Sequence, residues 1–251
     1  MNRRVFSLAA AALFAIVRGP AAANAGDATA AEPETVLLFD ETRKRPVPVA
    51  IYTDPTQQVR GPRLAIISHG YGGKNTDYGF IAACLASHGY YVASIQHEIP
   101  GDEPLPKTGN PYETRKPSWE RGVDNILFVT AELKKRRPDL DAENLLLAGH
   151  SHGGDTSMLF AQKYPDRVRA VISLDNRRMP FPRTRKPRLF SLRSSDQPPD
   201  EGVLPSPEEQ AELGMKVIKL TATKHDEMWD GGSEAQKAEI IRYILEFLRD
   251  L

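Results

Sequence analysis

The stretch Leu145-Leu146-Leu147-Ala148-Gly149-His150-Ser151-His152-Gly153-Gly154 decides the fold class of this chain. Its first four residues are apolar without interruption, which is typical of a strand buried on both faces of a sheet. Helical periodicity begins just after Gly154, so the serine lies on a sharp turn from strand to helix. Glycines on both sides of the turn let neighbouring backbone approach without a Cβ clash. We therefore expect Ser151 to be an exposed nucleophile, and the helix N-terminus beneath it favours negative charge there.

Outward from this turn, short apolar runs alternate with longer amphipathic ones from Glu34 to the end of the chain. This alternation predicts an α/β fold, with a mostly parallel central sheet and helices on both faces. Strands are expected at 36–39, 47–52, 63–68, 90–95, 145–148, 170–174, 189–192 and 217–220. Helices are expected at 77–88, 119–135, 155–164 and 233–251, with a further helix starting at the capping residue Ser206.

Two proline-bearing segments carry further expectations. Pro48 cannot donate to a sheet ladder, so its strand is expected at or near an edge. The polar segment 98–118 is too long for a simple connection, and we expect a loop there that covers the substrate.

The first residues predict an export signal. Arg3 and Arg4 form a basic start, 5–17 is an apolar run, and Ala23-Asn24-Ala25 has the form of a cleavage site. We expect a signal peptide over 1–25, a flexible leader over 26–33 and one catalytic domain over 34–251. The apolar run is too short for a membrane span, so no stable membrane insertion is expected. The segment 2–6 also resembles a twin-arginine signal, and either export route predicts a periplasmic or secreted protein.

Charge and composition exclude several partners. Lysine plus arginine and aspartate plus glutamate balance at 33 each among the 251 residues, which argues against nucleic acid or an anionic membrane surface as a partner. The expected substrate is a small molecule or lipid-like ester, neutral or weakly charged. The sequence has no His-Glu-x-x-His or similar ligand spacing, and we expect neither a metal nor a cofactor.

A serine nucleophile on such a turn needs a base and an acid, and in this fold they follow the serine in the order acid, then histidine. His225 follows the last expected strand and is the expected base. Two acids are candidates. Asp196 follows the penultimate strand, the usual position, and is preferred; Asp175 ends the preceding strand and could reach the same histidine. Either would orient the imidazole and stabilise its protonated form.

Two backbone N–H groups must also converge on the developing oxyanion. His152, the residue after the nucleophile, is expected to supply one. The glycine-rich loop His69-Gly70-Tyr71-Gly72-Gly73 follows an earlier strand, and Tyr71 is expected to supply the other.

Four motifs carry a family resemblance: Ile67-Ser68-His69-Gly70, Leu85-Ala86-Ser87-His88-Gly89-Tyr90, the turn around Ser151, and Ser173-Leu174-Asp175. Over most of 46–250 the chain resembles the platelet-activating-factor acetylhydrolase and dienelactone-hydrolase-like branch of the α/β-hydrolases. The resemblance implies Ser151 as nucleophile, His225 as base, and Tyr71 and His152 as oxyanion donors. In the acetylhydrolases the acid follows a Leu-Asp like the one ending at Asp175, so both acids stay open. True dienelactone hydrolases carry a cysteine at the nucleophile position, so that activity is not expected.

Together these features predict an exported hydrolase that cleaves carboxylic esters through an acyl-serine intermediate. Amide or peptide hydrolysis, or acyl transfer, on the same triad is an alternative. A third possibility is a binding protein that keeps the fold without catalysis.

Overall fold

The computed structural model describes residues 32–57 and 59–251. The expected signal peptide and most of the expected leader fall on 1–31, outside the described residues. The strands are β1 (Glu34–Asp40), β2 (Arg45–Tyr52), β3 (Arg63–Ser68), β4 (Tyr90–Ile95), β5 (Asp141–His150), β6 (Val168–Leu174), β7 (Arg188–Arg193) and β8 (Lys216–Lys219). The helices are α1 (Gly79–Ser87), α2 (Pro111–Arg136), α3 (His152–Lys163), α4 (Pro207–Leu213) and α5 (Glu234–Arg249), with 3₁₀ turns η1 (Pro165–Arg167) and η2 (His225–Glu227).

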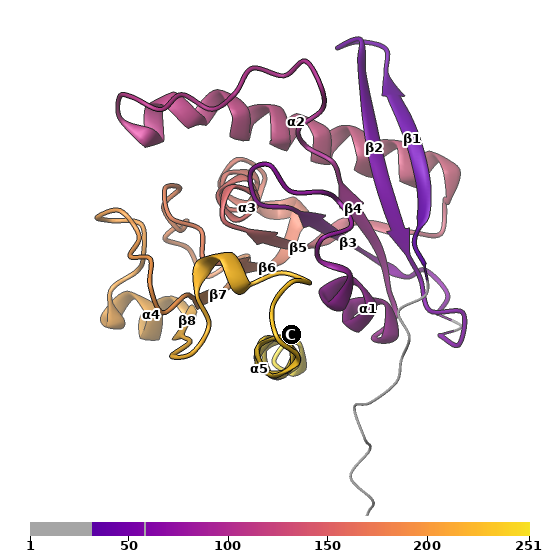
Figure 1. The fold of residues 1–251 in the computed structure, drawn as a ribbon. Helices are drawn as coiled ribbons and strands as arrows, with labels where there is room; N and C mark the ends of the chain where they lie inside the picture. Colours follow the sequence, from indigo (N-terminus) through magenta and orange to yellow (C-terminus); the bar gives the residue numbers. More distant parts are fainter. Residues whose placement is uncertain (1–31, 58) are drawn as a thin grey trace, which may run out of the picture.

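The eight strands form one sheet in the order β1-β2-β4-β3-β5-β6-β7-β8 (Figure 1). The pairs from β4 through β8 are all parallel, whereas β1 pairs with β2 and β2 with β4 in antiparallel fashion. The expected mostly parallel sheet is thus confirmed. Pro48 lies opposite Leu37 of the edge strand β1, and the pairing of β2 with β4 starts one residue later, at Val49.

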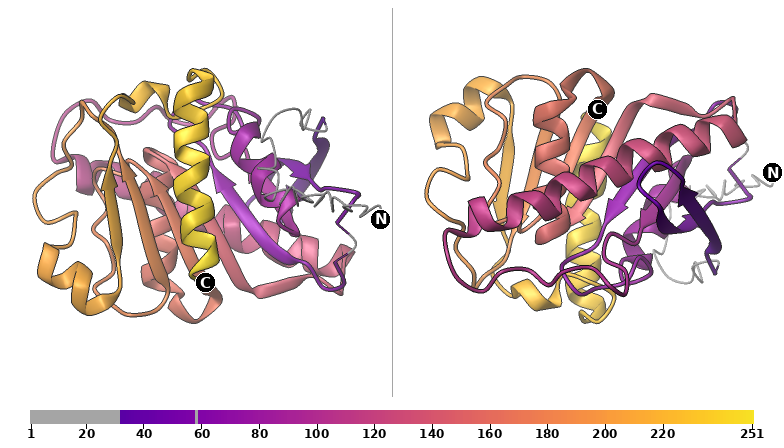
Figure 2. Two further views of the ribbon diagram at one scale, coloured as in Figure 1. Left: turned by 90° about the horizontal axis from the view of Figure 1, so that it is seen from below. Right: turned by 90° about the horizontal axis from the view of Figure 1, so that it is seen from above.

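Helices cover both faces of the sheet, as expected. Figure 2 shows α5 crossing one face and α2 crossing the other. Two apolar cores follow from this arrangement. One packs α2 and α3 against the sheet around Trp119, Phe160 and Leu147, and the other packs α1 and α5 around Ile81, Phe247 and Ile172. Burial of these side chains on both sides is the main driving force for the fold.

Helix α2 begins earlier than expected, which corrects the extent of the long loop. The helix starts at Pro111 rather than at Trp119, so residues 111–118 of the expected loop 98–118 are helical. Asn110 caps the helix, because its side chain accepts a hydrogen bond from the Tyr112 amide at 2.9 Å. A capping asparagine followed by proline is a known helix start, and this signal was present in the sequence.

None of the helices in the described ranges 32–57 and 59–251 combines the length and the apolarity needed to cross a membrane.

Candidate active site

Ser151 lies on the turn between β5 and α3, in a strained backbone conformation. Its φ is 52° and its ψ is −115°, a combination that L-residues adopt only where the surrounding structure imposes it. The flanking glycines are required by close contacts. A Cβ on Gly149 would lie 2.3 Å from the Gly153 carbonyl oxygen, and a Cβ on Gly153 would lie 2.1 Å from the Ser68 carbonyl oxygen. The turn thus has the geometry of a nucleophile elbow.

The loop after β8 brings His225 against this serine. The His225 Nε2 atom lies 2.9 Å from the Ser151 Oγ, and its Nδ1 atom lies 2.6 Å from Oδ2 of Asp175. The three side chains come from the ends of three parallel strands, β5, β6 and β8. They form one continuous hydrogen-bonded chain from carboxylate to hydroxyl, in the arrangement of a serine triad.

Asp175 is fully buried and tightly held. Its φ is 57°, which turns the chain sharply at the end of β6. Its Oδ1 atom lies 2.8 Å from Arg193 Nη2 and accepts a hydrogen bond from the Ser194 amide at 3.1 Å. Burial raises the pKa of Asp175, but the bond to His225 and the charge of Arg193 outweigh it and leave the pKa below its usual value. This carboxyl group is therefore ionised in the folded protein.

Asp196, the preferred acid on sequence grounds, lies elsewhere. Its side chain is exposed, and its Oδ1 atom accepts a hydrogen bond from the backbone amide of His225 at 2.8 Å. It therefore holds the main chain of the loop, whereas the imidazole contacts Asp175. In this geometry the alternative acid, Asp175, is the carboxylate that contacts the His225 ring.

His152 is a neutral, immobilised side chain. The Trp119 indole N–H donates to its Nδ1 at 2.9 Å, so the ring proton must lie on Nε2, which is 3.0 Å from the Ser118 Oγ. Burial, followed by the charge of Arg115, lowers the pKa of His152 to about 3. Both ring nitrogens of His152 are thus engaged, one by Trp119 and the other by Ser118. Its backbone N–H is the first of α3, a position without an intrahelical acceptor.

Tyr71 lies on the loop after β3, at the rim of the same cleft as Ser151. The Tyr71 ring is about half exposed, and its hydroxyl accepts a hydrogen bond from the Leu105 amide at 3.1 Å. Glu98 supports this loop, because its Oε2 atom accepts a bond from the Gly72 amide at 3.3 Å. Burial, partly offset by the Gly72 bond, raises the pKa of Glu98 to about 7.

His150 connects the same loop to His225. The Tyr78 hydroxyl accepts a hydrogen bond from the Gly70 amide at 3.2 Å and donates to His150 Nδ1 at 2.7 Å. The ring of His150 lies 4.7 Å from that of His225, centroid to centroid. Burial lowers the pKa of His150 to about 3, so this imidazole supports His225 as a neutral group.

Asp155, in the first turn of α3, anchors the loop that carries Asp175. It is buried, and its Oδ1 atom accepts hydrogen bonds from the backbone amides of residues 177, 178 and 179 at 3.1, 2.9 and 2.8 Å. We expect Asp155→Ala to destabilise the protein, because three amides lose their acceptor at a cost of about 1–3 kcal/mol for each buried group left unsatisfied.

For a chain of this size even the lower end of that loss, about 3 kcal/mol in total, corresponds to a fall in Tm of roughly 6–12 °C, measurable by circular dichroism. The exposed Asp166→Ala on the 3₁₀ turn η1 is the matched control, with little expected change. Equal melting temperatures for the two variants would contradict the anchoring role.

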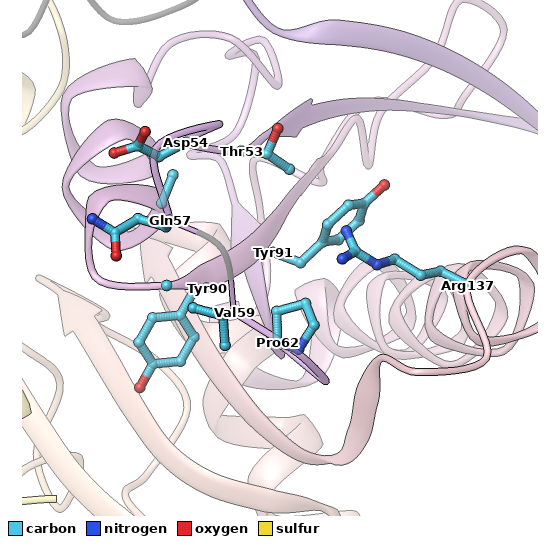
Figure 3. A pocket seen from close by; sticks show the side chains of 10 residues that line it. Thr53, Asp54, Gln57, Val59, Pro62, Tyr90, Tyr91 and Arg137 are labelled. Atoms are coloured by element: carbon cyan, nitrogen blue, oxygen red, sulfur yellow. The ribbon is translucent and has the colours of Figure 1, made fainter.

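The cleft above Ser151 is open and has a volume of about 360 Å³. It is lined by the glycine loop, His150, Ser151, His225 and Trp229. Figure 3 shows a different hollow, near the starts of β3 and β4, where Tyr91 lies beside Arg137. That hollow has only about 40 Å³ and room for a few waters. Open α/β sheets bind ligands at the carboxyl ends of their strands. The cleft above Ser151 lies at that edge of the sheet.

Several functional residues were not foreseen from the sequence. Trp119 and Ser118 fix the His152 ring, and Arg193 pairs with Asp175. The arginine had a readable signal, since a charged residue that ends an otherwise apolar strand needs a buried partner. No group of three potential ligands among His, Cys, Asp and Glu is poised for a metal in the described part of the chain.

Comparison with known proteins gives matches of three kinds. A family model described as serine aminopeptidase, S33, matches residues 62–174. The platelet-activating factor acetylhydrolase of Canis lupus familiaris is 27% identical over 159 residues, which cover 47% of this chain and 36% of that protein. The cutinase est2 of Thermobifida alba is 28% identical over 105 residues, covering 42% of this chain and 32% of that protein. The chain thus spans about a third of the length of these curated relatives.

Among solved structures, Thermogutta terrifontis esterase 2 phosphonylated by cyclosarin superimposes with a TM-score of 0.63 at 12% identity. The match covers 88% of this chain and 95% of that one. At such identity the likeness concerns the fold. Together with the sheet order and the elbow, these matches show that the chain has an α/β-hydrolase fold.

Proposed function

We propose that this protein is a serine hydrolase that cleaves carboxylic esters through an acyl-serine intermediate. The observation that carries the proposal is the unbroken hydrogen-bonded chain from Asp175 through His225 to Ser151, at 2.6 and 2.9 Å. The relatives named as an acetylhydrolase, a cutinase and an esterase support ester hydrolysis. The expected export signal would place this activity in the periplasm or outside the cell.

In the first half-reaction, the Ser151 Oγ attacks the ester carbonyl carbon while His225 Nε2 takes the hydroxyl proton. Asp175 holds the Nδ1 proton and stabilises the imidazolium that forms. The negative charge that develops on the carbonyl oxygen is received by the backbone N–H groups of His152 and Tyr71. The tetrahedral intermediate then expels the alcohol, which leaves with the proton from His225.

In the second half-reaction, a water molecule attacks the acyl-serine carbonyl and gives its proton to His225. Collapse of this second intermediate releases the carboxylic acid, and the proton returns to the Ser151 oxygen. The buried neutral states of His150 and His152 support this division of roles, and His225 is the imidazole that contacts the Ser151 hydroxyl.

Amide hydrolysis is the second candidate, because the matching family model bears the name of an aminopeptidase. A direct comparison separates the two. The protein is assayed with 4-nitrophenyl esters of increasing acyl length and with amino-acid 4-nitroanilides, and it is labelled with a fluorophosphonate probe. We expect probe labelling and ester turnover at rates well above those on the anilides. Faster anilide turnover would favour the aminopeptidase reading, and absence of labelling would favour a non-catalytic binding protein.

A further inference from the structure

Two exposed aromatic side chains line the cleft above Ser151. Tyr71 is 47% exposed and Trp229 is 38% exposed, and both belong to the wall of this cleft. Exposed large apolar side chains are few across 32–57 and 59–251, where they comprise Leu37, Phe39, Val59, Tyr71 and Trp229. Apolar surface that gathers at a cavity commonly marks a site for a ligand. We therefore asked what these two rings can bind.

The Trp229 ring is held in place by its own loop. Its Nε1–H group donates to the Asp226 carbonyl oxygen at 2.9 Å. The ring also lies directly on Gly231, where an added Cβ would be 2.4 Å from the Trp229 Cζ2 atom and 2.6 Å from its Cε2 atom. The N–H group is the one polar group of an indole. Because it is already used, the exposed part of Trp229 offers a ligand apolar ring surface.

The Tyr71 ring, on the loop after β3, is also fixed at its polar end. Its hydroxyl accepts the hydrogen bond from the Leu105 amide at 3.1 Å. The ring meets that of His152 at an angle of 66°, with the centroids 5.9 Å apart. Two rings that are already positioned lose little conformational freedom when a ligand binds.

The other residues of the cleft wall oppose an anionic ligand. Asp77 and Asp226 contribute carboxyl groups to the cleft, and in the part of the chain that the structure describes no lysine or arginine lines it. A carboxylate or phosphate on the ligand would be repelled by these acids. The cleft volume of about 360 Å³ is large enough for a small ring-bearing molecule.

We propose that the side chains of Tyr71 and Trp229 bind an aromatic ring of the substrate, carried on the acyl or the alcohol part of an uncharged ester. Aromatic rings attract one another beyond the burial of their surface, so the two rings favour an aromatic group over an aliphatic group of equal size. This inference rests on the proposed ester hydrolysis at Ser151 and narrows it to aromatic esters.

Matched ester pairs test the inference. For the alcohol side, 2-phenylethyl acetate is compared with 2-cyclohexylethyl acetate. For the acyl side, methyl 3-phenylpropanoate is compared with methyl 3-cyclohexylpropanoate. In each pair two methylene groups separate the ring from the ester, so the intrinsic reactivities are nearly equal, and hydrophobicity alone favours the cyclohexyl member. We expect the wild type to prefer the aromatic member of at least one pair by about fivefold in kcat/KM.

Variants of the two rings show whether they cause this preference. Trp229→Leu and Tyr71→Leu should each remove most of it, whereas Trp229→Phe should retain part of it. Phe39→Leu, the loss of an exposed ring on the edge strand β1, is the matched control and should keep the full preference.

Three results would overturn the inference. The first is a wild type that does not prefer the aromatic member of either pair. The second is a preference that survives in Trp229→Leu or in Tyr71→Leu. The third is a preference for acetylcholine over its uncharged isostere 3,3-dimethylbutyl acetate that exceeds the aromatic preference, since it would assign the rings to a cation.

A binding measurement separates this inference from the proposed function. The chain has two tryptophans, and Trp119 is fully buried whereas Trp229 is exposed. In the Ser151→Ala background, methyl 3-(4-nitrophenyl)propanoate, whose nitroaryl ring quenches indole emission, is titrated while tryptophan fluorescence is recorded. We expect saturable quenching that is lost in Trp229→Leu. Tyr71→Leu should raise Kd about fivefold, and Phe39→Leu should leave it unchanged.

The two failures are distinguishable. Saturable quenching that depends on Tyr71 and Trp229 supports the aromatic site even if the wild type turns over no ester. Ester turnover by the wild type without such quenching would leave the hydrolase intact and refute the aromatic site.

Discussion

Replacement of Ser151 by alanine is expected to lower kcat on any 4-nitrophenyl ester by at least about 10⁴-fold. The serine oxygen is the atom that would form the acyl bond, and no neighbouring side chain can replace it. His150 and His152 are buried as neutral rings, and their imidazoles are already engaged by Tyr78 and Trp119. In the variant, only the binding of the substrate in the cleft and the two oxyanion donors would remain to accelerate its hydrolysis by water.

Stopped assays of ester cleavage with purified variants measure this effect, and Ser87→Ala is the matched control. Ser87 ends α1 and bonds only locally, to the Cys84 carbonyl and the neighbouring His88, so its loss should leave turnover close to that of the wild type. A Ser151→Ala protein that is folded, yet keeps more than a tenth of the wild-type rate, would rule out the acyl-serine route.

The second large effect concerns the acid. Asp175→Asn should reduce kcat by about 10⁴-fold, as expected when the carboxylate that fixes the histidine tautomer is lost. Asp196→Asn should cost less than about tenfold, because its contact is to the His225 backbone amide and an amide oxygen can still accept that bond. Steady-state kinetics on one ester, with both variants prepared in parallel, makes the comparison.

Folding must be checked alongside, since Asp175→Asn also leaves Arg193 without its counter-charge. A thermal unfolding curve of the variant, recorded by circular dichroism, shows whether the protein is still folded at the assay temperature. If folded Asp175→Asn keeps its activity while Asp196→Asn loses it, the acid that orients His225 is Asp196 and the assignment of Asp175 is refuted.

The sheet and the elbow could be predicted because local sequence determines them. The strands 63–68 and 90–95 were predicted with the bounds observed for β3 and β4, since short, mostly apolar runs rich in β-branched and aromatic residues favour strands. The capping box at Ser206 was also predicted and is observed. At Ser151, glycines at fixed spacing between a strand and a helix allow essentially one backbone path.

The acid could not be chosen from the sequence, because both candidates end neighbouring parallel strands. The choice depends on the left-handed turn at Asp175, which directs the carboxylate toward His225, and on the loop path that turns Asp196 toward the backbone. Neither is a property of the residue type. The start of α2 was missed for another reason: its first turns are polar and carry Pro117, so the apolar periodicity becomes visible only from Trp119.

The left-handed backbone at Ser151 and Asp175 has an evolutionary consequence. A descendant that no longer needed catalysis would gain stability from glycine at position 151, since glycine adopts that backbone freely. Among the residues 32–57 and 59–251, the serine hydroxyl bonds only to His225. Glycine at position 175 would leave the Arg193 guanidinium without its counter-charge and the Ser194 amide without its hydrogen-bond acceptor. In descendants that lose the activity, we therefore expect Ser151 to be replaced first. Asp175 should still be present in descendants that have already lost the serine.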